Sequence, residues 1–227
     1  MTATLLGEAC WPEVRADTLL VPLGSVEQHG PHLPLDTDTR IAEALARRVA
    51  AGTEDTAVAP PLAYGASGEH EGFPGTVSIG SSALRAVVVE LLRSATRTFP
   101  RVVLVCGHGG NLDGIRAALA ELRDERRDVL AWYAAVPGGD AHAGRTETSL
   151  MLALAPQLVR RVPVPPGPTI ALAELMPRLR SMGVAGVSPS GVLGEPAGAT
   201  AAEGKRLLSS MAERLAALTQ VRPRARA

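Results

Sequence analysis

The sequence predicts a three-layer α/β/α fold around a mostly parallel central sheet. Apolar runs alternate with amphipathic segments, so that strand–loop–helix units repeat along the chain. RVVLVCG (101–107) is a continuous apolar run rich in β-branched residues, which is typical of a strand buried on both faces of a parallel sheet. A length of 227 residues suits one domain, which we place at residues 1–220, followed by a disordered basic tail at 221–227.

Four segments are expected to open this fold. TLLVPLG (18–24) predicts a buried strand that ends at a glycine. TRIAEALARRVAA (39–51) predicts a helix, because its apolar residues keep helical spacing. TAVAPPLAYG (56–65) is expected as a short strand that runs into a loop, and TVSIG (76–80) is a further strand candidate.

A helix at 81–99 follows, with a serine as its N-cap and one apolar face. The residues expected on that face are Leu84, Val87, Val88, Leu91 and Leu92. After it the chain continues with a strand at 101–107, a helix at 111–125, a strand at 129–134, a helix starting at 148–156 and a proline-rich connection at 160–170. The last helix is expected at 199–220, where Thr200 and Glu203 predict a capping box.

Composition narrows the class of protein. The chain is 46% hydrophobic and carries 23 basic and 23 acidic residues, so no net charge attracts nucleic acid. The N-terminus lacks the pattern of a signal peptide, and no apolar segment is long enough to span a bilayer. Cys10 and Cys106 suggest no disulfide framework. We therefore expect a cytoplasmic protein that binds neither nucleic acid nor membrane.

The five histidines carry the functional signal. Each lies in a glycine- or proline-rich stretch with a carboxylate close by: GSVEQHGPHLPLDTD (24–38), GEHEGFPG (68–75), CGHGGN (106–111) and DAHAGRTETS (140–149). Histidine and carboxylate side chains gathered on loops supply the ligands of metal centres. The pattern favours a metal-dependent hydrolase.

The first of these stretches offers three candidate ligands. Glu27 and His29 point the same way if the backbone between them is extended, and Asp38 opens a predicted helix, where the dipole also favours a carboxylate. Each has an ordinary alternative. Glu27 and His29 could be a surface pair, and Asp38 a helix N-cap.

His108 lies where a predicted strand breaks into GHGGN, whose glycines allow a ligand to approach closely. The alternative is a histidine that caps the next helix, and Asn111 is either that cap or a residue that orients a ligand. The G-x-G-x-x-G dinucleotide fingerprint is excluded because Leu112 stands where its last glycine belongs. A phosphate-binding loop is excluded because the required lysine is missing.

The remaining candidates lie in the other two stretches. His142 and Glu147 are not at the spacing of a helical zinc pair, so their partners must come from other loops. Glu69 and His70 are expected to form a substrate wall or a subunit contact rather than act directly. His32, beside prolines, is expected to hold its loop, and Cys106 to be a core thiol.

The four histidine-containing motifs, in this order, resemble those of the creatininase family of metal-dependent amidohydrolases, and the resemblance spans roughly residues 18–215. It implies that Glu27, Asp38 and His108 bind one divalent metal ion. His29 and Glu147 would bind a second, with Asp38 as the bridge, and His142 would be the catalytic histidine. Creatininase itself has an acidic metal ligand where this chain has Gly110, which counts against creatinine as the substrate.

Within the family, segments 59–80 and 187–204 resemble the branch that trims the mycofactocin precursor peptide. This resemblance implies a peptidase that releases a modified C-terminal Val-Tyr dipeptide, with one or two ions of Fe²⁺, Zn²⁺ or Mn²⁺ per subunit. It also implies a homo-oligomer. The alternatives are a hydrolase of a cyclic amide or formamide, and a catalytically inactive binding or assembly protein.

Overall fold

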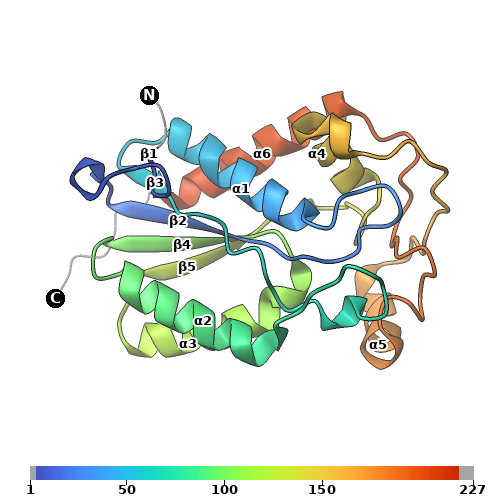
Figure 1. Ribbon diagram of the computed structural model, residues 1–227, viewed down its shortest axis with the longest axis horizontal. Helices are drawn as coiled ribbons and strands as arrows, with labels where there is room; N and C mark the ends of the chain where they lie inside the picture. Colours follow the sequence, from blue (N-terminus) through green and yellow to red (C-terminus); the bar gives the residue numbers. More distant parts are fainter. Residues whose placement is uncertain (1–3, 220–227) are drawn as a thin grey trace.

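The computed structural model, which describes residues 4–219, confirms the α/β/α architecture (Figure 1). Five strands form one sheet in the order β1-β3-β2-β4-β5, and every neighbouring pair is parallel. The strands are β1 (Thr4–Leu5), β2 (Thr18–Leu23), β3 (Thr56–Val58), β4 (Arg101–Cys106) and β5 (Val129–Tyr133). The tail predicted at 221–227 lies outside the described residues.

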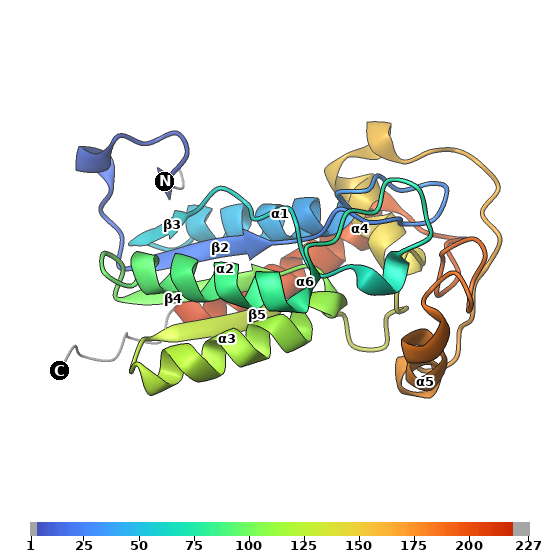
Figure 2. The same cartoon turned by 60° about the horizontal axis from the view of Figure 1, so that its bottom comes forward.

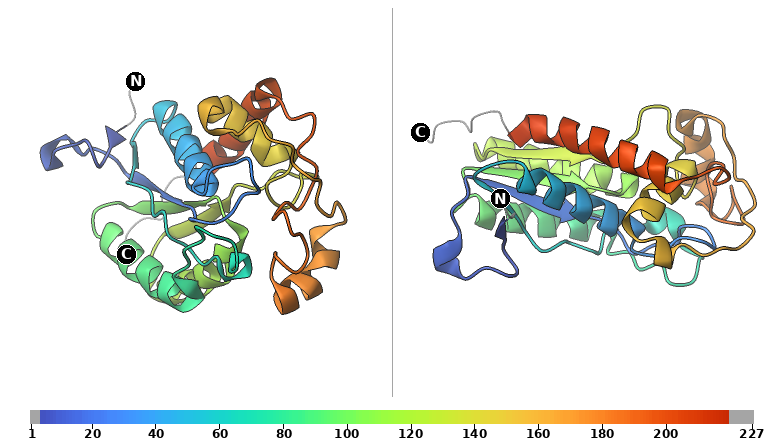
Figure 3. Two further views of the ribbon diagram at one scale, coloured as in Figure 1. Left: turned by 45° about the vertical axis from the view of Figure 1, so that its right-hand side comes forward. Right: turned by 90° about the horizontal axis from the view of Figure 1, so that it is seen from above.

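Different helices cover the two faces of this sheet (Figures 1 and 3). One face carries α1 (Thr37–Ala51), α4 (Arg145–Leu154) and α6 (Ala201–Thr219), and the other carries α2 (Gly80–Ala95) and α3 (Leu112–Asp124). Side chains alternate along a strand, so Leu20 of β2 packs in the first core while Leu19 and Val21 pack in the second. Both faces are thus buried, as the apolar strand sequences predicted.

One helix stands apart from these layers. Figure 2 shows α5 (Leu172–Met182) beyond the ends of the strands. Leu175 and Leu179 of α5 pack with Val184 and Leu193 in a small apolar cluster of their own. No helix was predicted here from the sequence, and Pro177 lies inside this one, where proline is normally unfavourable.

Several element predictions were wrong in detail. TVSIG (76–80) is not a strand: Val77 makes only an isolated antiparallel bridge with Val26. The serine N-cap of α2 is also wrong, because the helix begins at Gly80 and no side chain caps it. On α2, Val87 and Leu91 are 39% and 38% exposed rather than buried.

The capping box of the last helix forms only in half. The backbone N–H of Glu203 donates to Thr200 Oγ1 at 3.1 Å, as a box requires. The Glu203 carboxylate turns away and accepts hydrogen bonds from Arg145 and Ser149 instead. It therefore ties α6 to the start of α4.

The strand order determines where a ligand can bind. The chain passes from β2 to β3 on one side and later returns to β4 on the other side of β2, so the loops after β2 and β4 diverge at the sheet edge. Ligands of open parallel sheets bind at such switch points, beyond the carboxyl ends of the strands. Among the described residues, no helix is long and apolar enough to cross a membrane.

Candidate metal centre

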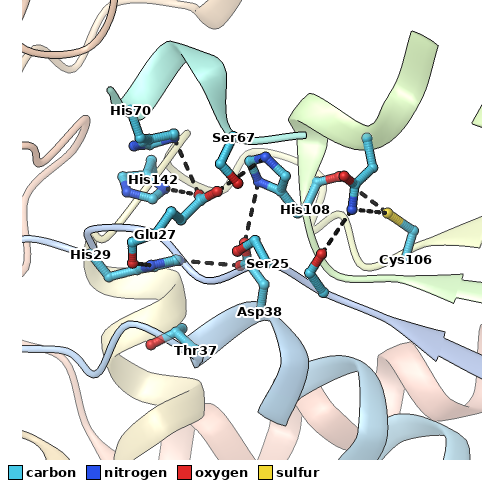
Figure 4. Close-up of polar contacts among 12 residues, drawn as sticks. Ser25, Glu27, His29, Thr37, Asp38, Ser67, His70, Cys106, His108 and His142 are labelled. Carbon is cyan, nitrogen blue, oxygen red and sulfur yellow. Dashed lines mark hydrogen bonds and ion pairs between the residues drawn. The ribbon is translucent and has the colours of Figure 1, made fainter. Parts of the chain in front are cut away.

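Four loops beyond the carboxyl ends of neighbouring strands bring the site residues together (Figure 4). The loop after β2 carries Glu27 and His29 and leads to Asp38 in the first turn of α1. The segment after β3 contains the short 3-10 helix η2 (Gly68–His70). His108 directly follows β4, and the segment after β5 carries His142 and leads to Glu147 at the start of α4.

Two glycines allow α1 to begin against the strand ends. A Cβ atom at Gly107 would lie 2.3 Å from the carbonyl oxygen of Asp38, and one at Gly24 would lie 2.4 Å from the backbone nitrogen of Thr39. Any side chain at either position would push the first turn of α1 away from β2 and β4. The glycines therefore fix the position of Asp38.

The ligand atoms of the site residues fall into three groups, within each of which all atoms lie within 4.8 Å of one another. The groups are Glu27–Asp38–His108, His29–Asp38–Glu147 and Glu27–His29–His142. The first two have the same composition as the two ligand sets expected from the sequence. Asp38 belongs to both of them.

Asp38 faces a different histidine with each carboxylate oxygen. Its Oδ1 lies 3.2 Å from Nε2 of His29, and its Oδ2 lies 3.3 Å from Nδ1 of His108. Ser25 Oγ also donates to Oδ2, at 2.7 Å. Burial raises the pKa of Asp38, but the positive charges of His29 and His108 and their hydrogen bonds together outweigh this and hold the pKa well below its usual range. Asp38 is thus an anion that lies between the Glu27–Asp38–His108 and His29–Asp38–Glu147 ligand groups.

Glu27 is a fully buried carboxylate without hydrogen bonds from the described residues. Its nearest polar neighbours are Nε2 of His108 at 3.1 Å and Nε2 of His70 at 3.2 Å. Burial raises the pKa of Glu27, but the charge of His108 brings it down to about 2. A buried anion is costly unless it is paired or coordinates a metal ion, so this donor set fits a divalent cation.

Three histidines each use one ring nitrogen to hydrogen-bond a backbone carbonyl oxygen. His29 Nδ1, His108 Nε2 and His142 Nε2 lie 3.2, 3.1 and 2.8 Å from backbone carbonyl oxygens. A carbonyl oxygen only accepts, so each of these nitrogens carries the hydrogen. In the neutral ring the other nitrogen is then free to bind a metal ion or a proton, as is usual for metal-ligating histidines.

The protonation of these histidines differs. Burial lowers the pKa of His29, but the Asp38 carboxylate raises it to about 10 overall. Glu27 likewise raises the pKa of His108 above its ordinary value against the effect of burial. A divalent ion would displace these protons. The pKa of His142 is lowered well below its usual value by burial and by the charge of His29, so this ring is neutral.

Glu147 is held by the backbone. Its Oε2 accepts a 2.6 Å hydrogen bond from the N–H of Ala143 and lies 3.8 Å from Nε2 of His29. Burial raises its pKa to about 7. Ala143 has a φ of 51°, an unfavourable conformation for a residue other than glycine. Such strain is concentrated at functional sites.

Glu69 and His70, expected as substrate-binding residues, have different surroundings. His70 is only 3% exposed and lies against Glu27, inside the cluster rather than on its wall. Glu69 is partly exposed, and its Oε1 lies 3.4 Å from Nε2 of His108. A Cβ at Gly110 would lie 2.2 Å from that same oxygen, so Glu69 occupies the space of a side chain at 110. Substrate contact stays a prediction for both residues.

Other residues singled out in the sequence lie outside the three groups. His32 Nε2 lies 2.8 Å from Thr148 Oγ1 and so links its loop to α4. Asp36, the other aspartate of the first motif, also lies outside them and pairs with Arg40. Cys106 is buried, which raises its pKa to about 11 and keeps the thiol protonated.

Two further residues belong to the site: Asn111, for which the sequence left two roles possible, and Gln28, which was not predicted. Asn111 makes no capping bond: its Nδ2 donates to the Gly24 carbonyl, and its Oδ1 accepts from the N–H of Ala66. Gln28 was missed. If the chain were extended it would point away from Glu27 and His29, but its amide lies among the site histidines. A glutamine flanked by two candidate ligands was the available signal.

Known proteins resemble this chain in sequence. The family model described as "Creatininase: Creatinine amidohydrolase" matches residues 7–219. A protein named mycofactocin precursor peptide peptidase, from Mycolicibacterium smegmatis, is 57% identical over 198 residues, which cover 85% of this chain and 80% of that protein. The creatinine amidohydrolase of Pseudomonas putida is 34% identical over 193 residues, covering 69% of this chain and 74% of that protein.

Solved structures resemble it in fold. The crystal structure of creatinine amidohydrolase (creatininase) covers 100% of both chains with a TM-score of 0.80 at 28% identity. The family match takes in all four loops that carry the site, and the fold match takes in the sheet that positions them. This chain therefore belongs to the creatininase family of metal-dependent amidohydrolases.

Proposed function

We propose that this chain is a metal-dependent peptidase that removes the modified C-terminal Val-Tyr dipeptide from the mycofactocin precursor peptide. The observation that carries the proposal is the pair of three-residue groups that share Asp38. The choice of substrate is supported by relatives named mycofactocin precursor peptide peptidase, which are 57% and 51% identical to this chain. The second of these comes from Mycobacterium ulcerans and covers 89% of this chain.

In this proposal Glu27, Asp38 and His108 hold one divalent ion, and His29, Asp38 and Glu147 hold another. Carboxylate and imidazole ligands suit zinc, manganese or ferrous iron. Solved creatininases described as "Zn-Zn type" and "Creatininase Mn" support the first two. When bound, such ions polarise an amide carbonyl and lower the pKa of a water molecule.

His142 is the proposed proton carrier. Its ring is neutral, and Nδ1 lies 3.9 Å from Glu27 Oε1 on the side of the carboxylates. It accepts a proton at Nδ1 from the attacking water and returns this proton to the departing amine, as a general acid–base group does. Throughout, its Nε2–H stays bonded to the carbonyl oxygen of Gln28, 2.8 Å away, which holds the ring in place.

The test offers three substrates to the purified, metal-loaded protein. The modified precursor peptide should be cleaved, with the dipeptide product identified by mass spectrometry, while creatinine and a formylated aminopyrimidine should remain intact. Hydrolysis of either small amide without peptide cleavage would instead support the cyclic-amide or formamide hydrolase. A protein that binds no metal ion and cleaves none of the three would be the inactive binding or assembly protein.

Assembly and location are part of the same proposal. The homo-oligomer is proposed from the family resemblance of the sequence motifs. Light scattering coupled to size-exclusion chromatography measures the assembly, and a monomer at micromolar concentration would contradict it. The cytoplasmic location stays a prediction from the sequence.

A further inference from the structure

Gln28 is a buried amide whose orientation can be assigned without ambiguity. Its Oε1 lies 2.8 Å from the backbone nitrogen of Gly30, which can only donate. The other atom of the amide is therefore the nitrogen, Nε2. The loop that contains Gly191 packs directly onto this amide, since a Cβ at Gly191 would lie 1.8 Å from Oε1.

The amide nitrogen has two hydrogens and three polar neighbours. They are the carbonyl oxygen of Gly191 at 3.0 Å, Nε2 of His142 at 3.0 Å and Nδ1 of His70 at 2.8 Å. The carbonyl oxygen takes one hydrogen because it can only accept. His142 cannot take the other, because its Nε2 already donates to the carbonyl oxygen of Gln28 at 2.8 Å. The second hydrogen therefore goes to His70.

His70 consequently differs from the other three site histidines, whose ring N–H groups point to backbone carbonyl oxygens. Its Nδ1 accepts from Gln28, so the ring hydrogen is on Nε2, and Nε2 lies 3.2 Å from Oε1 of Glu27. We infer that Gln28 fixes His70 in the Nε2–H form, so that an N–H rather than a bare ring nitrogen faces the Glu27 carboxylate at 3.2 Å and positions it electrostatically. The other oxygen of Glu27, Oε2, faces Nε2 of His108 at 3.1 Å, so His70 is the neighbour of Oε1, and Glu27 belongs to two of the three ligand groups.

This inference rests on the proposed function, because a positioned Glu27 matters only if it binds a metal ion. It assigns a role to two residues that the ligand sets do not include. His70 is a positioning residue rather than a substrate-binding or metal-binding one, and Gln28 acts through it. Outer partners of this kind orient metal ligands, and their loss typically lowers metal affinity or activity by roughly 10- to 100-fold.

The first test reads the His70 tautomer directly. Protein with nitrogen-15-labelled histidine is loaded with Zn²⁺, and long-range proton–nitrogen correlation spectra show which ring nitrogen carries hydrogen. Wild-type His70 should be in the Nε2–H form, with its signals assigned by their absence from His70→Gln. In Gln28→Glu the carboxylate can only accept, so the hydrogen should move to Nδ1. The exposed Gln157→Glu change is the matched control and should leave the tautomer unaltered.

The second test measures Zn²⁺ affinity by equilibrium dialysis and stays decisive even if Gln28→Glu does not fold. His70→Leu removes the N–H that faces Glu27 and should weaken binding by roughly 10- to 100-fold. His70→Gln keeps an N–H at the end of the side chain and should bind close to wild type. Equal losses in the two variants, or a wild-type His70 with a bare Nε2, would overturn the inference.

The two proposals fail in distinguishable ways. If the unaltered protein neither binds Zn²⁺ nor cleaves the peptide, both are overturned. If it binds and cleaves normally while His70 carries its hydrogen on Nδ1, the proposed function survives and only the role of Gln28 and His70 is wrong.

Discussion

The two ligand groups that share Asp38 differ in the surroundings of their other carboxylate, which is Glu27 in one group and Glu147 in the other. Glu27 is fully buried, has no hydrogen bond from the described residues, and has a pKa of about 2. The side chain of Glu147 is 19% exposed, accepts a hydrogen bond from Ala143, and has a pKa of about 7. The first group presents a ready anion, whereas the second must lose a proton near neutral pH before it can bind an ion.

This contrast suggests a division between a firmly held ion and a more exchangeable one. A carboxylate without other partners gains most from a cation, while one already bonded to a backbone N–H gains less. Asp38 joins the two groups, so its removal should affect both, whereas the outer ligands should affect one group each.

The largest effect is expected from Asp38→Asn. An amide oxygen is a much poorer ligand than a carboxylate, so this variant should lose most of its bound metal and all measurable peptide cleavage. Asp36→Asn, in the same sequence motif, is the control, because Asp36 pairs with Arg40 at the surface, and this variant should leave both properties intact. Metal analysis by plasma mass spectrometry decides. Near-normal metal content in Asp38→Asn would remove the shared-ligand assignment.

His142→Ala should slow turnover by roughly 100- to 10,000-fold, because it removes the proposed proton carrier. Metal content should stay close to that of the wild type, since His142 is not in either group that shares Asp38. Steady-state kinetics and metal analysis on one preparation separate the possibilities. Large metal loss would make His142 a ligand in the group it forms with Glu27 and His29, and full activity would leave it only a structural role.

Glu147→Gln should separate the two groups from each other. Metal content is expected to fall by about one ion per subunit while the fold persists, because the Glu27 group stays complete. Circular dichroism checks the fold and metal analysis counts the ions. Loss of both ions would show that the groups bind as one unit, and unchanged stoichiometry would assign Glu147 another role.

A smaller effect is expected in the pH dependence of binding. Groups with raised pKa values keep their protons up to higher pH, so metal binding must displace those protons and affinity rises with pH. The first group displaces a proton from His108 only, since Glu27 is already ionised. The second displaces protons from His29 and, below about pH 7, from Glu147.

Calorimetric Zn²⁺ titrations in buffers of different ionisation enthalpy count the protons released. The second ion should release more protons than the first at pH 6.5, and Glu147→Gln should abolish this difference along with the second binding event. Equal proton release by the two ions would contradict the contrast between Glu27 and Glu147.

The sheet and its long helices were predictable because their sequence signals are local. Continuous apolar strands and helical spacing identified β2, β4, β5 and most helices to within a few residues. The predictions failed where tertiary contacts, rather than local sequence, determine which residues are buried or helical. Val89 rather than Val87 or Leu91 faces the core, because the apolar side of α2 is wider than the surface that covers it. α5 was missed because Pro177 argues against a helix locally.

The candidate site was predictable as a set of residues but not as an arrangement. Loops after adjacent parallel strands must meet, so Glu27, Asp38 and His108 could be expected together. The position of His70 could not be expected, because it depends on how the segment after β3 folds back over the sheet edge. Gln28 was missed because residues 27–30 turn, with Gly30 at a φ of 65°, so side chains there do not alternate as in a strand.

The close contact of Gly107 with the first turn of α1 means that Asp38 is in position only in the folded protein. Metal binding is therefore coupled to folding, and through folding to how long the protein survives in a cell. Asp38 shares its helix with Ile41 and Leu45, which are core residues, so the ligand groups exist only when the core is assembled. An ion that binds only the folded state at 100 times its dissociation constant adds about 2.7 kcal/mol to the free energy of unfolding. A cell short of metal would therefore hold a larger unfolded fraction of this enzyme, exposed to proteases, and would clear apoprotein sooner than loaded protein.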